Sequence, residues 1–194
     1  LPAYSNTSEL SSTRINTILN LPTILWTAPV SIETGETTLL ADTIAVETPL
    51  LQYLQLIETT EQGDLFISRD GKLTFHKRNH FNNTGLLFTD DNTGIKYTNI
   101  SVVYGTELMY NQIDANALSG PTYRIDDSTS QALYGVMNLK ISDTLHASSA
   151  EVIDMISWLI GNYAQPEYRF DRFSINLNDY SSSIQNSILA LDMG

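Results

Sequence analysis

The sequence feature that most constrains the fold is a helix pattern that runs directly into a hairpin pattern, within residues 48–76. Apolar residues recur at helical spacing between residues 50 and 57, which is typical of a helix with one buried face. Thr48 is expected to cap the start of this helix, and Gly63 is expected to end it in the left-handed conformation. A second strand-like pattern follows without a linker, so the helix and the hairpin are predicted to form one local unit.

The hairpin is predicted to turn at Asp70-Gly71, because this dipeptide suits the two positive-φ positions of a type I′ turn. A two-residue turn at this point places Phe66 opposite Phe75, an aromatic cross-strand pair worth ~0.2–1 kcal/mol. Apolar residues lie on both faces of the two strands, and none of the hairpin residues is chemically reactive. We therefore interpret the hairpin as part of a wall packed on two sides.

The charge balance argues against nucleic acid or an anionic membrane as the main partner. The formal net charge is −12, with 10 basic residues scattered along 194 positions, and the densest basic run is only residues 76–78. Phosphate binding needs clustered Lys and Arg, so neither specific nucleic-acid binding nor a membrane partner is expected. An acidic surface could instead line a passage for DNA by repelling it.

Cysteine is absent, which excludes disulfides, thiolate catalysis and cysteine-ligated metals. No apolar run approaches the ~20 residues of a membrane span, and no signal peptide is recognisable. Since the sequence begins Leu-Pro rather than Met, we expect a fragment of a longer chain or a processed product.

The pattern of the whole chain predicts an α+β fold with mainly antiparallel strands and three or four helices, including the helix–hairpin insert. Two lobes are expected, residues 1–99 with the helix–hairpin unit and residues 100–194 with helices near 148–164 and 181–191, although one continuous unit is an alternative. Residues 148–151 read as a capping box. A one-residue slip in alternation at Asp171-Arg172 predicts a β-bulge.

A search for reactive constellations yields no catalytic, cofactor-binding or metal-binding residues. His76 and His80 are four apart but lie on a predicted strand and loop, so this spacing makes no shared metal face, and His146 is isolated. Neither a G-x-S-x-G elbow, an HExxH pair nor a phosphate loop is present. Residues 89–94 resemble a calcium loop faintly, but an Asx-type turn is the preferred interpretation.

Four aromatic residues near the C-terminal third leave two interpretations open. Tyr163, Tyr168, Phe170 and Phe173 could form a platform for a sugar ring, or they could pack a helix onto a strand. We favour core packing, because large aromatic side chains dominate the energetics of protein interiors.

The order of motifs resembles a segment found in tail proteins of long-tailed bacteriophages. In that family a helix of the form L-x-x-L-Q-x-I-x-x-x-E-x-G runs into a hairpin of the form G-x-L-(F/Y)-x-x-x-D-G-x-L-x-F-x-x-R. The matching residues in this sequence are Leu51, Leu54, Gln55, Ile57, Glu61, Gly63, Leu65, Phe66, Asp70, Gly71, Leu73, Phe75 and Arg78.

A second series of matches follows in the same order. Residues 110–113 (YNQI) resemble the family's (Y)-N-x-(I/V) strand, and residues 130–139 (SQALYGVMNL) resemble its S-x-x-x-Y-G-x-x-x-(L) turn. Residues 165–170 (QPEYRF) resemble (A-x)-P-x-x-R-(F), and residues 188–194 resemble the closing L-L-x-L-x-x-G. Together the matches cover roughly residues 48–194.

The resemblance implies a minor tail protein or baseplate hub, located in the virion and assembled in the cytoplasm of the host bacterium. Such proteins typically form a trimeric collar where the tail tube meets the tip, in contact with tube or distal tail proteins, the tape measure protein and a fibre or spike. No catalytic residue is implied in this segment. A receptor- or carbohydrate-binding module of the tail tip is the alternative function, and a cell-wall hydrolase is a third.

Overall fold

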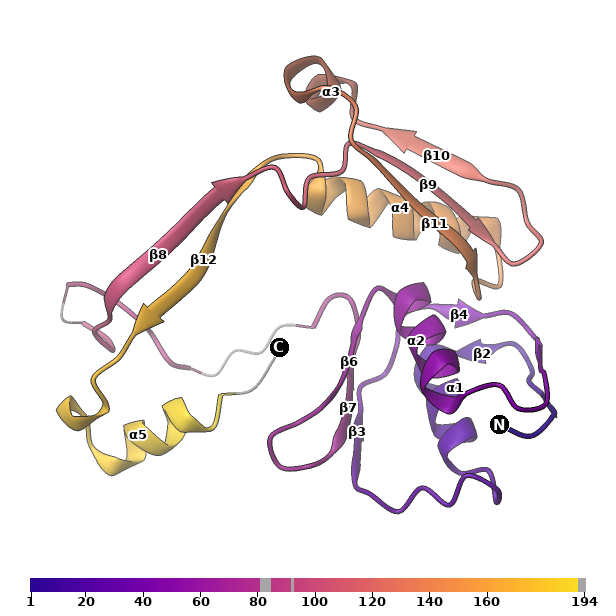
Figure 1. Cartoon of the computed structure of the whole chain (residues 1–194), viewed down its shortest axis with the longest axis horizontal. Helices are drawn as coiled ribbons and strands as arrows, with labels where there is room; N and C mark the ends of the chain where they lie inside the picture. The colour runs from indigo at the N-terminus through magenta and orange to yellow at the C-terminus, as the bar shows by residue number, and fades with distance from the viewer. Residues whose placement is uncertain (81–84, 92, 192–194) are drawn as a thin grey trace. The chain divides into compact units, whose positions relative to one another are not determined.

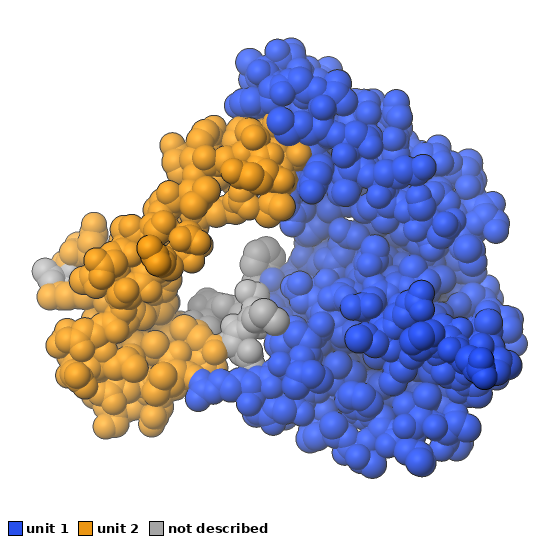
Figure 2. Space-filling view, viewed as in Figure 1, with its two compact units in different colours: residues 1–80, 110–164 blue, residues 81–109, 165–194 orange. Residues whose placement is uncertain are grey.

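A computed structural model of the chain describes residues 1–80, 85–91 and 93–191. Figure 1 shows the helices and strands of the described residues, and Figure 2 colours the two compact units into which the chain divides. Unit 1 comprises residues 1–80 and 110–164, and unit 2 comprises residues 81–109 and 165–194. The sequence-based division at residues 99 and 100 stays a prediction.

Unit 1 holds most of the regular structure and has two hydrophobic cores. Its elements are β1 (Tyr4–Ser5), β2 (Glu9–Leu10), α1 (Ser11–Leu19), β3 (Val30–Ile32), β4 (Thr38–Leu39), β5 (Thr43–Ile44), α2 (Leu50–Glu61), β6 (Asp64–Ile67), β7 (Leu73–His76), β9 (Gln112–Ala117), β10 (Tyr123–Asp126), α3 (Ser128–Tyr134), β11 (Asn138–Thr144) and α4 (Ser149–Tyr163). We call residues 1–80 the first lobe and residues 110–164 the second lobe.

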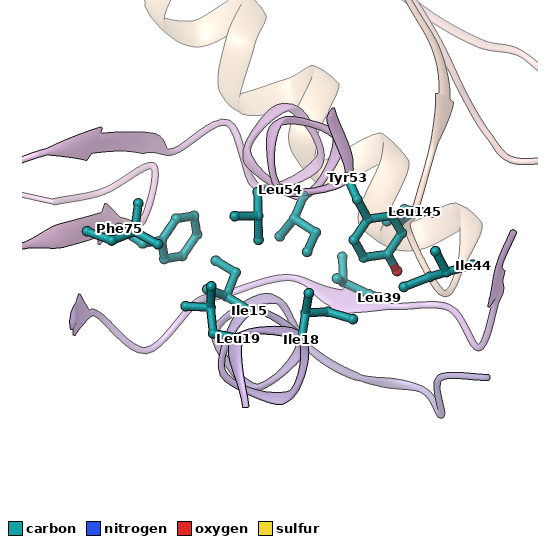
Figure 3. Close-up of a cluster of buried hydrophobic side chains, with 11 residues drawn as sticks. Ile15, Ile18, Leu19, Leu39, Ile44, Tyr53, Leu54, Phe75 and Leu145 are labelled. Carbon is teal, nitrogen blue, oxygen red and sulfur yellow. The ribbon is translucent and has the colours of Figure 1, made fainter. Parts of the chain in front are cut away.

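The first core lies between α1 and α2 (Figure 3). Ile15 and Ile18 of α1 are fully buried, and Leu54 and Ile57 of α2 are buried with them, so each helix presents one apolar stripe to the other. Phe75 from β7 closes one side of this core. The helical spacing seen in the sequence therefore does place the apolar side chains inside.

The hairpin forms, but the predicted register is wrong by one residue. Leu65, not Phe66, lies opposite Phe75, and Phe66 lies opposite Thr74. Gly71 alone has a positive φ of 80°, and its N–H donates to the Ser68 carbonyl oxygen at 2.9 Å. This geometry is a three-residue loop with a glycine bulge rather than a two-residue type I′ turn, and the extra loop residue shifts the pairing by one.

Both predicted helix caps of α2 are also wrong. The Thr48 hydroxyl donates to the Ala45 carbonyl oxygen, and Pro49 occupies the N-cap without a side-chain hydrogen bond. At the other end Gln62, with a φ of 56°, takes the left-handed position instead of Gly63. Gly63 is needed for another reason, because a Cβ there would lie 2.2 Å from the His76 carbonyl oxygen.

The second core forms where α4 packs on a three-stranded sheet of order β10-β9-β11. Val152, Met155, Ile156 and Leu159 recur on one face of α4 and are all buried. β9 pairs antiparallel with β10 and parallel with β11.

The N-terminus of α4 forms one half of the predicted capping box. The Ser148 hydroxyl accepts from the Glu151 N–H at 3.4 Å. The Glu151 carboxylate accepts from the N–H groups of Ala147, at 3.1 Å, and Thr38, at 2.9 Å. This side chain therefore connects the second lobe to β4 of the first lobe.

Unit 2 contains β8 (Thr98–Gly105), β12 (Glu167–Ser174), the short 3₁₀ helix η1 (Leu177–Asp179) and α5 (Ser182–Leu189). β8 and β12 form a two-stranded antiparallel ribbon. The register shifts at Arg172, which confirms the predicted bulge. Ser181 caps α5, because its hydroxyl accepts a hydrogen bond from the Ile184 N–H.

The fold class is α+β, as predicted, with both antiparallel and parallel strand pairs. The described residues contain five α-helices, more than the three or four expected, because residues 128–134 form a regular helix. Among the described residues no helix is long and apolar enough to cross a membrane. The closing motif at residues 188–194 lies partly outside the described residues.

Candidate interaction surfaces

The glutamate of the helix–hairpin motif is a structural group. Glu61 is fully buried at the end of α2. Its carboxylate accepts hydrogen bonds from the Ser11 hydroxyl, at 2.7 Å, and from the N–H groups of Glu36, at 2.9 Å, and Thr37, at 3.0 Å. Because a buried carboxylate is tolerated only when hydrogen-bonded or paired, these donors explain a glutamate at this position without any reaction.

The motif residues of the second lobe meet at one buried node around Asn111. The Asn111 amide donates to the Ser130 hydroxyl at 3.1 Å and to the Gly135 carbonyl oxygen at 2.7 Å, and its oxygen accepts from the Met137 N–H at 2.8 Å. Ser130 in turn donates to the Ala164 carbonyl oxygen at 2.5 Å. This node ties α3, β9 and the end of α4 together.

A fully buried arginine organises the first lobe in the same way. The Arg14 guanidinium donates to Glu9 at 2.6 Å and to Asp42 and the Tyr53 hydroxyl, each at 2.7 Å. Burial opposes the charge on Arg14, but the hydrogen bond to Glu9 and the interactions with Tyr53 and Asp42 outweigh it, so its pKa is raised. Burial also raises the pKa of Tyr53, which therefore stays neutral.

The histidines do not assemble a reactive group. His76 and His80 stack with ring centroids 3.6 Å apart, and His80 Nδ1 lies 3.0 Å from a Glu33 oxygen. His146 is buried beside Thr144, and burial, with a smaller contribution from Arg78, lowers its pKa to about 4. Within the described residues no group of three or more His, Asp or Glu side chains could hold a metal ion.

The calcium-like segment is an Asx-type turn, as the sequence analysis preferred. The Asp91 carboxylate accepts from the Thr93 N–H at 3.0 Å and from the Thr93 hydroxyl at 2.6 Å. Position 92 of this segment lies outside the described residues. The sequence also predicts a turn at Asn82-Asn83, and these two residues lie outside the described residues.

The aromatic residues of β12 are exposed, so our prediction of core packing is wrong for them. Tyr168 and Phe170 are 75% and 71% exposed, and Phe173 is 41% exposed. Only Tyr163 belongs to a core, against Trp158 of α4. In unit 2 the ribbon has two strands, and the Tyr168 ring lies tilted against the Tyr104 ring across them, with ring centroids 4.6 Å apart.

Exposed apolar side chains therefore cover much of the ribbon, and we call this set the ribbon surface. It consists of Ile100, Val102, Val103, Tyr104, Leu108, Tyr168, Phe170 and Phe173. Scattered apolar residues are normal on a protein surface, whereas apolar residues gathered on one face mark a candidate interaction site. The pairing places Val102 opposite Phe170 and Tyr104 opposite Tyr168, so these four share one face of the ribbon.

Unit 2 also holds an aromatic-lined pocket of about 230 Å³ at one end of the ribbon. Its walls are formed by Phe88, Tyr97, Ile100, Phe170 and Phe173. Phe173 contacts Phe88 and Tyr97, with ring centroids 5.3 Å and 6.0 Å away. Tilted rings of this kind can bind an apolar ring or an aliphatic side chain.

A second apolar hollow of about 310 Å³ lies in unit 1, between α2 and the β6–β7 hairpin, and we call it the helix–hairpin groove. Its lining consists of Trp26, Leu50, Leu51, Leu54, Leu65, Phe66, Ile67 and Leu73. Leu54 and Leu73 are buried, whereas Leu51 and Ile67 are 62% and 61% exposed. The groove thus has a buried floor and an exposed apolar rim.

Among the solved structures that are similar to this chain are two prophage tail proteins. One is the 43 kDa tail protein of prophage MuSo2 from Shewanella oneidensis, with 12% identity, a TM-score of 0.46, and coverage of 80% of this chain and 44% of the other. The second is the prophage tail protein gp18 from Listeria monocytogenes, with 12% identity, a TM-score of 0.49, and coverage of 84% and 51%. Both are phage tail proteins.

The chain spans about half the length of each of these two structures. No protein-family model matches the chain, and a comparison with curated proteins finds no match.

The sequence did not predict the ribbon surface or the helix–hairpin groove, and the reason differs between the two. The exposed aromatics of β12 alternate like those of a buried strand, so no sequence signal separates the two cases. The helix–hairpin groove joins Trp26 to residues 50–73, and only folding brings these segments together.

Proposed function

We propose that this chain is a structural component of a phage tail, a hub or minor tail protein that joins the tail tube to the distal tip and helps to form the channel for DNA. The motifs that resemble the tail-protein family are the starting point. The observation that carries the proposal is the role of two polar residues in these motifs. Glu61 and Asn111 form hydrogen bonds within the chain, so both hold the fold together, as expected of a structural protein.

The exposed apolar surfaces support an assembled state. The ribbon surface and the helix–hairpin groove are apolar features of a chain in which only 16% of residues are charged. Obligate assemblies bury surfaces of this kind. In the proposed assembly the chain is a homo-oligomer, a trimer, that contacts tube or distal tail proteins, the tape measure protein and a fibre or spike within the virion.

The acidic charge suits a passage for DNA. A net charge of −12 disfavours adhesion of phosphate groups by like-charge repulsion, so a wall rich in carboxylates lets DNA slide past. The proposal assigns no catalytic residue and no cofactor to this chain.

Electron microscopy of the intact tail tests this proposal. With an epitope tag on the chain, we expect a ring of label where the tube meets the tip, and a bore lined by carboxylates in a reconstruction. A neutral or basic bore would refute the charge argument, and a label found away from the tube would refute the location. Clear lysis of cell walls in a zymogram would show that the chain is an enzyme instead.

The aromatic-lined pocket favours one second candidate, a receptor- or carbohydrate-binding module of the tail tip. Aromatic rings bind the apolar faces of sugars, and Phe170 is 71% exposed at this pocket. A glycan array tests it with the native chain and the Phe170→Ala variant. Binding that the variant loses would favour the module, and no binding by the native chain would leave the structural role.

A further inference from the structure

The strongest unexplained feature of unit 2 is its C-terminal helix. α5 has eight residues, and none of them is buried. Isolated helices shorter than about 12 residues are marginal in water, because nucleation is unfavourable and few hydrogen bonds follow it. A helix of this length needs a tertiary partner along its apolar stripe.

α5 carries a spaced row of apolar side chains and no charge. Ile184 and Ile188 are four residues apart, which places their side chains on one face of α5, and the apolar Leu191 follows two residues after the helix ends. Residues 181–191 contain no Asp, Glu, Lys or Arg. The row matches the anchors with which an amphipathic helix binds an apolar groove.

The helix–hairpin groove has the complementary chemistry. Its lining residues are all uncharged, with Leu54 and Leu73 on the floor and the exposed Leu51 and Ile67 on the rim. Two uncharged surfaces can join without stripping water from an ionised group, which is costly. Two copies of a chain with net charge −12 repel each other, so their contact is most favourable where neither surface is ionised.

We propose that α5 of one copy docks into the helix–hairpin groove of a second copy of this chain. The contact is heterologous, because a helix of unit 2 meets a groove of unit 1, and repeated contacts of this type generate a ring when the rotation closes. The inference rests on the proposed function as a ring-forming tail component and names the two surfaces that meet.

Single-cysteine variants test this contact, since the native chain has no cysteine. The chain carrying Ile184→Cys, lengthened by a tag that changes its mass, is mixed with the chain carrying Leu51→Cys under mild oxidation. Non-reducing gels then separate the mixed disulfide dimer from the two homodimers by mass. Each variant carries one cysteine, so a mixed dimer can form only between two chains. Both positions are exposed, and circular dichroism checks that each variant keeps the native fold.

The matched control replaces Leu51→Cys by Leu133→Cys, which is 68% exposed on α3 and lies outside the groove. Docking raises the local concentration of the two thiols, so we expect about tenfold more mixed dimer for Ile184→Cys with Leu51→Cys than for the control. Equal yields would overturn the proposal. A predominant Ile184→Cys homodimer would also overturn it, because it would show a contact between two α5 helices.

A double variant, Leu51→Cys with Ile184→Cys, tests whether the contact lies between two copies or within one chain. A disulfide between copies forms less often when the protein is diluted, so we expect the yield of cross-linked dimer to fall with dilution. Cross-linking that persists at monomer mass on dilution would overturn the second copy as the occupant. If microscopy shows a ring at the tail tube but the cross-link fails, this docking is rejected and the proposed function stands. If the cross-link forms but the chain is absent from tails, the proposed function is rejected and the docking stands.

Discussion

The two units of this chain differ in how much apolar surface they bury. Unit 1 has two buried apolar cores, and it also buries the charged side chain of Arg14 completely. In the described part of unit 2, the buried hydrophobic residues are Ile95 and Met109, while its ribbon surface stays exposed. The comparison predicts that the two cores of unit 1 supply most of the free energy of unfolding, and that unit 2 supplies little of it.

The largest expected effect contrasts two phenylalanines. Phe75→Ala removes a fully buried ring from the first core and should lower the free energy of unfolding by about 4 kcal/mol. Phe170→Ala removes an exposed ring of unit 2 and should change it by less than about 0.5 kcal/mol. Urea unfolding followed by circular dichroism measures both, and similar losses would break the comparison.

The second prediction concerns acid. Burial lowers the pKa of His146 to about 4, against about 6.5 in the unfolded chain, so the unfolded chain takes up a proton first as the pH falls. The stabilisation is complete above pH 6.5 and is lost between pH 6.5 and pH 4, by about 3 kcal/mol. Urea unfolding at several pH values measures this loss.

The His146→Gln variant is the control for this pH dependence, because it removes the titrating group and keeps a polar side chain beside Thr144. The variant should lose about 3 kcal/mol less than the native chain over the same window. Identical pH profiles would show that His146 is accessible to protons in the folded state.

A third, smaller effect is expected at the buried node of the second lobe. Asn111→Ala leaves the Met137 N–H and the Ser130 hydroxyl with one partner fewer, at a cost of about 2 kcal/mol. Asn162→Ala is the matched control, because Asn162 is exposed on α4 and donates only to Trp158 of its own helix. Equal thermal unfolding of both variants would argue that the node contributes nothing.

The smallest effect compares two helix caps. Ser148→Ala and Ser181→Ala each remove an N-cap worth about 1 kcal/mol, at α4 of unit 1 and α5 of unit 2. Ser148→Ala should lower the global free energy of unfolding, whereas Ser181→Ala should only speed amide exchange within residues 182–189. A global loss from Ser181→Ala would show that α5 is coupled to the core.

The sequence was sufficient for elements whose signal is local. The helical stripes of α2 and α4 lie where the spacing predicts them, and the slip at Asp171-Arg172 marks a real bulge. The hairpin register was missed because Asp-Gly also fits a three-residue loop, in which only glycine takes positive φ. One residue in the loop decides which face each side chain takes.

Burial and long-range polar contacts could not be predicted in this way. Alternating aromatics in β12 predict a strand, but whether a helix covers that strand depends on the rest of the fold. Arg14 and Tyr53 are 39 residues apart, and neither residue type signals its partner. The helix–hairpin groove was out of reach for the same reason, since folding brings Trp26 to residues 50–73.

The ribbon of unit 2 has a consequence for synthesis on the ribosome. About 60 residues separate the end of β8 from the start of β12, so β8 leaves the ribosome several seconds before its pairing strand exists. The second lobe is completed in that interval. Nascent β8 therefore waits with unpaired backbone groups, and a translational pause before residue 167 would lengthen that time.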